Sequence, residues 1–368
     1  MKIILVIHAL PGGGTGRVLT YMANYWARAG HRVTILTLEK SDSPFYFLTD
    51  SVEWISLDLA RDSTTFAEGM LKNLRRIHLI RKAIKESAPD CIISFVYSIN
   101  VLVLLASRFL GIPVIISERN HPDYSKEDRF IWHLLRRILY PMADHLTLQT
   151  GEIRDWFKDF NMSIHIIKNP VMITRENIEA EPEITLPTGM RIVAMGQLID
   201  QKGFDHLLHA FARIHKSHQD CKLIILGAGK LLDELKLISI RLGIEKYVYI
   251  PGRVKNPFSI FSRCDLFVLS SRYEGFPNAL LEAMACGLSV ISYDCPSGPG
   301  EMIKDNVNGL LVPNKDLDAL VDAIRKLIND DKLRVRLGRE AIKVQNRFSI
   351  EKVMDQWNNL LPKYSPIK

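Results

Sequence analysis

The stretch Cys264–Tyr293, CDLFVLSSRYEGFPNALLEAMACGLSVISY, decides the fold of this chain. Within it, Leu266–Leu269 is an unbroken apolar run, which is typical of a strand buried on both faces of a parallel sheet. A polar turn follows, and Pro277 then stands in the first turn of a helix, where proline is tolerated. Gly287 ends that helix because glycine readily adopts a left-handed backbone, and Leu288–Ile291 predicts the next buried strand. This strand–turn–helix–strand unit indicates an α/β domain that binds ligands at the carboxyl ends of its strands.

Two carboxylates flank the turn, because Glu274 precedes the predicted helix and Glu282 lies within it. The backbone amides of a first helical turn have no partner inside the helix, so they form a natural phosphate site between these carboxylates. The predicted phosphate site comprises Gly275, Phe276, Pro277, Asn278 and Ala279. For a single glutamate the simpler interpretation would hold: Glu274 would stabilise the helix dipole, and Glu282 would be an exposed helical residue. Two glutamates eight residues apart around GFPNALLEAMACG favour a ligand site, in which each carboxylate accepts hydrogen bonds from a different polyol.

This string resembles the signature of the retaining family 4 glycosyltransferases, the group 1 family, and in particular bacterial cell-surface polysaccharide and O-antigen transferases. The resemblance covers both halves of the chain and is strongest from Gly196 to Val312. It implies the GT-B architecture, an α/β fold of two Rossmann-like, doubly wound domains that face each other across a cleft. We therefore expect an acceptor-binding domain over residues 1–170 and a nucleotide-sugar-binding domain over 171–350. A final helix, 351–368, is expected to return to the first domain.

The length and the cysteines agree with this interpretation. A chain of 368 residues fits two domains of about 180 residues each. Five scattered cysteines without a CxxC pair indicate reduced thiols and a cytoplasmic protein. No apolar run approaches the ~20 residues of a membrane span, and the opening MKIILVIHAL predicts a strand rather than a signal peptide.

The positive charge of the chain is concentrated in one window. Between Lys72 and Arg137 there are twelve Lys and Arg against six Asp and Glu, a local net charge of +6 out of +7 for the whole chain. Two predicted helices in this window, 70–86 and 129–140, combine an apolar face with basic residues. One such helix is explained equally well by a solvated basic face, whereas two in one domain favour docking on an anionic bilayer. We expect a peripheral protein on the cytoplasmic face of the inner membrane, without a nucleic-acid partner.

Two turns in the first half are candidate ligand sites. Gly13 and Gly14 follow the first predicted strand and open a helix whose bare amides suit a phosphate, although many such turns are only tight connections. No GxGxxG motif with an acidic residue at dinucleotide spacing accompanies them. In a later turn, the resemblance places Glu118 or Arg119 where the family has a histidine beside the donor sugar, and His121 follows. We expect these three residues as acceptor or sugar contacts; for His121 a merely solvated side chain is the alternative.

The family's donor motifs match turns in the second half. Gly196 opens a turn in which the family uses an arginine and a lysine to bind the diphosphate. This chain has Gln197 at the arginine position and retains the lysine as Lys202. The other predicted donor contacts are Gly227, Gly229, Arg253 and Val254. Asp316-Leu317-Asp318 has the form of a metal-binding DxD motif, but it opens a predicted helix, where acidic residues belong for capping; we therefore expect no metal there.

The resemblance implies a retaining transfer, in which positive charge develops on the sugar and negative charge on the departing diphosphate. We expect Lys202 and Glu274 as the catalytic residues. Lys202 and the amides of Gly14 and of residues 275–278 would stabilise the diphosphate, and Glu274 would hold sugar hydroxyls. Glu282 would bind the ribose. No cofactor or metal is expected beyond the substrate nucleotide sugar.

The expected enzyme is a hexosyl- or N-acetylhexosaminyltransferase. Its expected donor is a UDP-sugar, and GDP-mannose is the second candidate. The expected acceptor is a lipid-diphosphate-linked saccharide in cell-surface polysaccharide biosynthesis, and a soluble or lipid-A-core acceptor is the alternative. A nucleotide-sugar epimerase of the same architecture is a rival, but Glu118 and His121 form no obvious acid–base set for it. A non-catalytic, partner-binding subunit is a further rival, against which the presence of Lys202, Glu274 and Glu282 argues.

Overall fold

The structure is a computed structural model that describes residues 1–10, 12–39, 43–59, 66–124 and 129–362. The chain forms two compact units. Unit 1 comprises Met1–Asn169 together with the segment from Ile350 onward, and unit 2 comprises Pro170–Ser349. These limits lie within one residue of the domain boundaries expected from the sequence.

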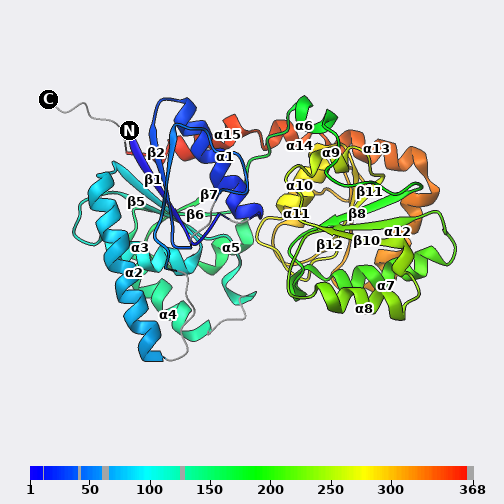
Figure 1. The fold of residues 1–368 in the computed structure, drawn as a ribbon, viewed down its shortest axis with the longest axis horizontal. Coiled ribbons are helices and arrows are strands. Elements are labelled where there is room, and N and C mark those ends of the chain that lie inside the picture. The colour runs from blue at the N-terminus through cyan, green and yellow to red at the C-terminus, as the bar shows by residue number, and fades with distance from the viewer. Residues whose placement is uncertain (11, 40–42, 60–65, 125–128, 363–368) are drawn as a thin grey trace. The chain divides into compact units, whose positions relative to one another are not determined.

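Unit 1 is built on a parallel sheet of seven strands in the order β3-β2-β1-β4-β5-β6-β7 (Figure 1). The strands are β1 (Lys2–Ile7), β2 (Arg32–Thr37), β3 (Val52–Ser56), β4 (Cys91–Phe95), β5 (Val114–Ser117), β6 (His145–Leu148) and β7 (Ser163–Ile166). The α-helices are α1 (Gly14–Arg28), α2 (Phe66–Ser87), α3 (Tyr97–Ser107), α4 (Arg129–Leu139), α5 (Gly151–Trp156) and α15 (Ile350–Asn358). Two 3-10 turns, η1 (Pro122–Tyr124) and η2 (Tyr140–Met142), flank α4.

Unit 2 contains a second parallel sheet, of six strands in the order β10-β9-β8-β11-β12-β13. The strands are β8 (Arg191–Met195), β9 (Lys222–Leu226), β10 (Val248–Gly252), β11 (Leu266–Leu269), β12 (Ser289–Asp294) and β13 (Leu310–Pro313). The α-helices are α6 (Arg175–Glu179), α7 (Phe204–His215), α8 (Leu232–Arg241), α9 (Phe258–Phe261), α10 (Asn278–Ala285), α11 (Pro299–Met302), α12 (Leu317–Asn329), α13 (Asp331–Ala341) and α14 (Val344–Arg347). The 3-10 turns are η3 (Asp200–Lys202) and η4 (Glu245–Tyr247).

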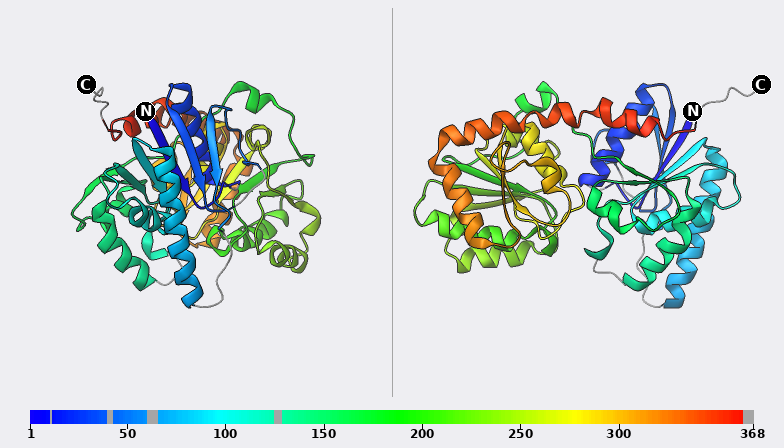
Figure 2. Two further views of the ribbon diagram at one scale, coloured as in Figure 1. Left: turned by 60° about the vertical axis from the view of Figure 1, so that its left-hand side comes forward. Right: turned by 180° about the vertical axis from the view of Figure 1, so that it is seen from behind.

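Both faces of the unit 2 sheet are buried, which explains why its strands are continuous apolar runs. On β11, Leu266 and Val268 join the core formed with α7, α8 and α12, whereas Phe267 and Leu269 join the core formed with α9, α10 and α14. Helices accordingly cover this sheet on both faces (Figures 1 and 2). The two sheets confirm the predicted α/β fold with Rossmann-like domains. Gly287 ends α10 with a positive φ of 79°, as the sequence predicts.

The final helix belongs to unit 1, as the resemblance implied. Trp26 on α1 donates a hydrogen bond from its Nε1 to Asn358 Oδ1 at 2.8 Å. The rings of Trp26 and Trp357 meet edge to face, with centroids 6.5 Å apart, and both side chains are buried. Contacts of this kind between aromatic rings contribute about 0.5–1.5 kcal/mol beyond the burial of their area, so α15 is firmly part of this core.

Candidate functional site

The strand order of unit 2 creates one topological switch point. From β8 the chain passes to β9 and β10 on one side, and it then returns to place β11 beside β8 on the other. The connections that follow β8 and β11 leave the carboxyl edge of the sheet in opposite directions, which opens the usual ligand-binding crevice of such sheets. They carry the turn Gly196–Lys202 and the turn Ser270–Pro277. Both predicted catalytic residues therefore lie at the switch point.

Backbone and side-chain hydrogen bonds join these two turns. The Arg272 amide donates to the Gln201 carbonyl at 2.8 Å, and Gln201 Nε2 donates to the Tyr273 carbonyl at 3.0 Å. Ser270 Oγ donates to the Lys202 carbonyl at 3.0 Å. These bonds hold Lys202 against the turn that carries Glu274, although 72 residues separate the two in sequence.

Arg272 strengthens this connection through its side chain. Its Nη2 and Nη1 donate to the two carboxylate oxygens of Asp205, at 2.6 and 3.0 Å, in the bidentate arrangement that a guanidinium favours. Burial opposes the charged form of Asp205, but the hydrogen bonds and charge of Arg272 prevail and lower the pKa of that carboxyl. Glycine at position 203 lets the two turns approach closely. Gly203 has a φ of 60°, and a Cβ there would lie 2.1 Å from the Ser270 carbonyl oxygen. Arg272 belongs to the polar turn predicted after Leu266–Leu269, but its pairing with Asp205 was not predicted.

The centre of the site is an ion pair between the two predicted catalytic residues. Lys202 Nζ lies 2.6 Å from Glu274 Oε1, and Ser271 Oγ donates to the same oxygen at 2.6 Å. Glu274 is 5% exposed, whereas Lys202 is 20% exposed and so retains access to solvent. The sequence assigned these residues to different parts of the donor and did not predict that they pair. Ser271 was also missed as a partner of Glu274.

The predicted phosphate turn is supported from behind by the loop after β12. The Glu274 amide donates to the Pro296 carbonyl at 3.1 Å, and Ser297 Oγ donates to the Gly275 carbonyl at 3.1 Å. Gly298 has a φ of 101°, and a Cβ there would meet the Pro277 ring at 2.5 Å. This loop therefore fixes the backbone of the turn, a role that was not predicted. Pro277 is the N-cap of α10, so the helix begins one residue later than predicted, at Asn278.

Glu282 lies on α10, in the second turn of the helix. Its side chain is buried, with 5% exposed, although Glu is almost never so buried unless it has a partner. The simple interpretation of Glu282 as an exposed helical glutamate is therefore wrong. Its assignment to the ribose remains a prediction.

The other predicted donor residues lie at the same edge of the unit 2 sheet. Gly196 follows β8. A Cβ on Gly227 would lie 1.8 Å from the Gly196 carbonyl oxygen. A Cβ on Gly229 would lie 2.4 Å from the Leu198 carbonyl oxygen. Close packing between the two turns therefore requires these glycines, independently of any nucleoside. The Gln197 and Arg253 side chains are exposed beyond β8 and β10, and Val254 is buried.

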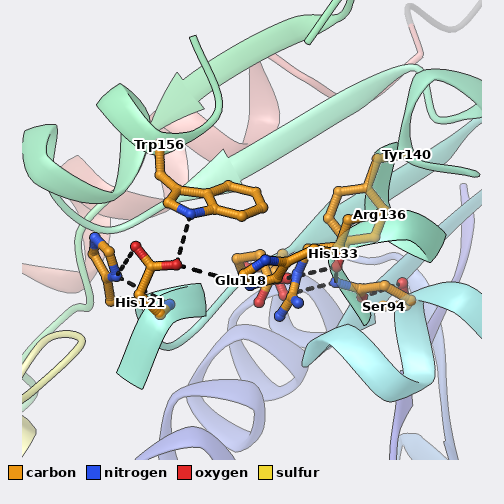
Figure 3. A network of polar contacts seen from close by, with 10 residues as sticks. Ser94, Glu118, His121, His133, Arg136, Tyr140 and Trp156 are labelled. Carbon is orange, nitrogen blue, oxygen red and sulfur yellow. Dashed lines mark hydrogen bonds and ion pairs between the residues drawn. The ribbon is translucent and has the colours of Figure 1, made fainter. Parts of the chain in front are cut away.

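In unit 1, Glu118 lies at the centre of a buried polar network (Figure 3). It is 1% exposed, and its Oε1 accepts hydrogen bonds from Arg136 Nε and Tyr140 Oη, each at 2.6 Å. Asn100 Nδ2 donates to Tyr140 Oη at 3.2 Å. Burial, followed by the Glu118 charge, raises the pKa of Tyr140 well above its ordinary value, so the phenol stays protonated and donates. The carboxylate of Glu118 thus has strong partners inside the fold, and its contact with a sugar remains a prediction.

Arg136 corrects one expectation from the sequence. It belongs to the basic window that we assigned to a membrane surface, yet only 2% of its side chain is exposed. Its guanidinium lies over the Tyr97 ring, 4.7 Å from the centroid, while it pairs with Glu118. The helical spacing of charged residues does not by itself show which face of a helix is buried. In α4, Arg136 lies on the buried face.

His121 and the glycine turn also lie at the carboxyl edge of the unit 1 sheet. His121 Nδ1 accepts a hydrogen bond from the Asp123 amide at 3.3 Å, and burial lowers the pKa of this imidazole. The same aspartate accepts from Trp156 Nε1 at 3.1 Å (Figure 3). Gly14 is the first residue of α1, the helix that follows β1 in the chain, and Gly13 is its N-cap with open space where a Cβ would lie. Whether these residues contact a ligand remains a prediction.

The DxD-like motif has the structural role that we expected. Asp316 is the N-cap of α12, and its Oδ1 accepts a hydrogen bond from the Ala319 amide at 2.9 Å. Asp318 forms an ion pair with Arg213.

Comparison with known proteins identifies the family. Residues 178–344 match the family model described as "Glycosyl transferases group 1", and residues 13–169 match the "Glycosyl transferase 4-like domain". Over 362 residues, 98% of both chains, the sequence is 30% identical to a Campylobacter jejuni protein. That relative is named "GalNAc-alpha-(1->4)-GalNAc-alpha-(1->3)-diNAcBac-PP-undecaprenol alpha-1,4-N-acetyl-D-galactosaminyltransferase". The chain belongs to the group 1 glycosyltransferases.

Two further comparisons agree with this membership. A second C. jejuni protein, "N-acetylgalactosamine-N,N'-diacetylbacillosaminyl-diphospho-undecaprenol 4-alpha-N-acetylgalactosaminyltransferase", is 31% identical over 244 residues, which cover 64% of this chain and 66% of that one. The sucrose-phosphate synthase of Thermosynechococcus elongatus has a similar structure, with a TM-score of 0.81 over 98% of both chains at 18% identity. At that identity the likeness concerns the fold, which is GT-B, and not the substrates.

The position of Gln197 in this glycosyltransferase allows a direct prediction. Its exposed side chain lies in the same turn as Lys202, at the position where the family resemblance leads us to expect an arginine. A Gln197→Arg substitution therefore adds a planar guanidinium that can bind two oxygens of a diphosphate. We expect this variant to bind UDP about tenfold more tightly, since a charge-assisted hydrogen bond contributes about 1.5–3 kcal/mol. Isothermal titration calorimetry measures the UDP affinity of each variant. Gln197→Lys is the matched control, because it adds the positive charge without the planar guanidinium. An unchanged affinity in Gln197→Arg means that this side chain does not face the diphosphate.

Proposed function

We propose that this glycosyltransferase transfers a sugar, with retention of anomeric configuration, from a UDP-sugar to a lipid-diphosphate-linked saccharide in bacterial cell-surface polysaccharide assembly. The observation that carries the proposal is the Lys202–Glu274 pair at the switch point of unit 2, beside the turn before α10. A cation and a hydroxyl acceptor are thereby placed together, as a sugar diphosphate requires. The C. jejuni relatives, whose names specify diphospho-undecaprenol-linked saccharides, support the choice of acceptor.

The residues suggest how the transfer proceeds. The bond between the anomeric carbon and the diphosphate oxygen breaks, and the negative charge that develops on the diphosphate is stabilised by Lys202 and the turn amides. Glu274 exchanges its bond with Lys202 for bonds to the sugar hydroxyls, which orients the sugar. The acceptor hydroxyl attacks the same face of the anomeric carbon, and its proton passes to the departing phosphate oxygen. Glu282 orients the nucleoside through the ribose.

A panel assay tests this function. The purified protein is incubated with labelled UDP-sugars and GDP-mannose, with and without a bacterial lipid extract, and the organic and aqueous phases are analysed. We expect label from a UDP-sugar in the lipid fraction only when the extract is present. A free epimer of the nucleotide sugar instead indicates the epimerase alternative, and transfer to a water-soluble product indicates a soluble acceptor. Intact donors in every reaction contradict the proposal.

The unit 1 surface adds support for a membrane-bound acceptor. None of the helices in the described parts of the chain has the length and apolarity to cross a bilayer. However, α2 and α4 both pack on α3 and lie side by side (Figures 1 and 2). Each of these helices exposes large apolar side chains. We call these side chains the α2–α4 surface: Met70, Leu71, Leu74, Phe130, Ile131, Leu134 and Ile138. Exposed apolar clusters of this kind mark interaction sites, and exposed Arg75 and Arg137 accompany this one.

The α2–α4 surface changes the expected mode by which a peripheral protein would bind the cytoplasmic face of the membrane. The sequence indicated an electrostatic attachment, but Arg76 and Arg81 donate to backbone carbonyls within unit 1, including Leu59 and Ala106. Insertion of apolar side chains from α2 and α4, assisted by the remaining basic residues, is therefore the stronger mechanism. Such insertion resists salt better than electrostatic attraction does.

Liposome flotation tests the α2–α4 surface. We expect wild-type protein to float with anionic liposomes and to retain much of this binding at high salt. The Phe130→Ser, Leu134→Ser double variant should bind at least about tenfold less, because burial of each side chain contributes about 1.5–3 kcal/mol. Leu237 and Ile240, exposed apolar residues on α8 of unit 2, provide the matched control when both are replaced by serine. Equal losses in the two double variants, or a wild type that never floats, contradict the mechanism.

A further inference from the structure

Arg119 is a buried cation at the carboxyl edge of the unit 1 sheet. It follows β5 directly, and its side chain is only 7% exposed. Its Nη1 donates to Asn169 Oδ1 at 2.6 Å, and its guanidinium lies over the Phe95 ring, 4.6 Å from the centroid. The Gln149 amide, in the orientation that satisfies both of its polar atoms, donates to the Arg119 carbonyl at 3.1 Å and accepts from Arg119 Nη1 at 3.2 Å. These neighbours hold the guanidinium in one orientation, but all of them are neutral.

No carboxylate within the described parts of the chain forms an ion pair with Arg119, and its Nε and Nη2 have no hydrogen-bond partner there. Burial lowers the pKa of this guanidinium to about 9, so it remains charged at neutral pH. A buried charge without a partner is costly. Arg136 provides the contrast within the same unit, because it is equally buried but lies 2.6 Å from Glu118. The fold thus neutralises one of these arginines and gives the other no counter-ion among the described residues.

The identity of the two unpaired donors indicates the missing partner. Nε and Nη2 lie on the same edge of the planar guanidinium, so together they form the fork that binds two oxygens of a carboxylate or phosphate in parallel. Nη1, on the other edge, is already used by Asn169. The carboxyl edge of a parallel sheet is also where such domains bind ligands. We propose that Arg119 is an anion-binding residue of unit 1, whose Nε–Nη2 edge binds two oxygens of a diphosphate.

This inference deepens the proposed function and rests on it for the choice of a diphosphate. Both substrates of the proposed reaction carry that group, the lipid-linked acceptor and the nucleotide sugar. The assignment of unit 1 to the acceptor favours the lipid-linked diphosphate. Both unpaired nitrogens are shielded from solvent, so a diphosphate reaches them only when the covering side chains move.

Binding measurements on the full-length protein test the site without relying on transfer. The probes are farnesyl diphosphate, which stands for the lipid-linked diphosphate, and UDP, and the variants are Arg119→Lys, which keeps the charge but not the fork, and Arg119→Met. We expect both variants to bind farnesyl diphosphate roughly 10- to 100-fold more weakly, the loss expected for two charge-assisted hydrogen bonds. Lys202→Ala is the reciprocal control and should weaken UDP instead. A loss confined to UDP in the Arg119 variants would assign the same fork to the nucleotide diphosphate.

Thermal unfolding distinguishes a ligand site from a structural arginine. Since Arg119 is a buried charge without a counter-ion, Arg119→Met should leave the melting temperature unchanged or raise it. Arg136→Met leaves the buried Glu118 carboxylate without its cation, so this variant should have a lower melting temperature. The proposal is overturned if Arg119→Met lowers the melting temperature as Arg136→Met does, or if the folded Arg119 variants bind both diphosphates like the wild type.

Discussion

We expect the Lys202→Ala variant to lose at least about 100-fold in turnover, as enzymes do when a donor that stabilises a developing negative charge is removed. Lys202 is the cation of the turn after β8, where Gln197 stands at the position of the arginine expected from the family resemblance. It therefore carries an unusually large share of the charge on the departing diphosphate. Steady-state transfer rates with saturating donor measure the effect on turnover.

The ion pair of Lys202 requires a control in this experiment. Removing the lysine also leaves Glu274, at 5% exposure, without its cation, so part of the loss has a structural origin. The Lys202→Ala, Glu274→Gln double variant relieves that unpaired charge. If Lys202 acts on the diphosphate, the double variant is at least as slow as Lys202→Ala. Recovery of turnover in the double variant contradicts a catalytic role for Lys202.

The two glutamates are expected to respond differently to substitution. Glu282→Ala should weaken UDP binding by about 1–3 kcal/mol, roughly 5- to 150-fold in Kd, because the ribose loses its hydrogen-bond acceptor. Glu274→Gln should lower turnover strongly but leave UDP affinity unchanged or improved. UDP has no sugar for Glu274 to hold, and the substitution releases Lys202 for the diphosphate. Calorimetry with UDP on both variants compares them directly, and equal losses of affinity contradict the division of roles.

The sequence predicted the strands well where composition alone determines them. The boundaries of β11 agree to the residue with the predicted run Leu266–Leu269, since it is a short apolar run between polar turns. It missed β6, whose sequence HLTL alternates polar and apolar residues, and the short helix α5. It also left the segment after residue 174 without a helix, where a capping box between Thr174 and Asn177 starts α6. These short elements depend on local hydrogen bonds and on tertiary contacts more than on periodicity.

The site was predictable as a set of residues but not as a set of contacts. Lys202, Glu274 and Glu282 lie in recognisable motifs, and the strand order brings the first two together. Their ion pair depends on the way Arg272 and Gln201 connect the two turns, which no motif records. The basic helices show the same limit: helical spacing identified a charged face, but the packing of α4 decides that Arg136 is buried and that Phe130 is exposed.

The most direct test of the proposed transfer is the structure of its product. A purified lipid-diphosphate saccharide that accepts label in the panel assay is incubated with the corresponding UDP-α-sugar. Mass spectrometry and the one-bond carbon–hydrogen coupling at the new anomeric centre are then measured. We expect an acceptor that is heavier by one sugar residue, joined in the α configuration, and formed far more slowly by Lys202→Ala. A β-linked product, or an acceptor that is unchanged while the donor is consumed, would contradict it.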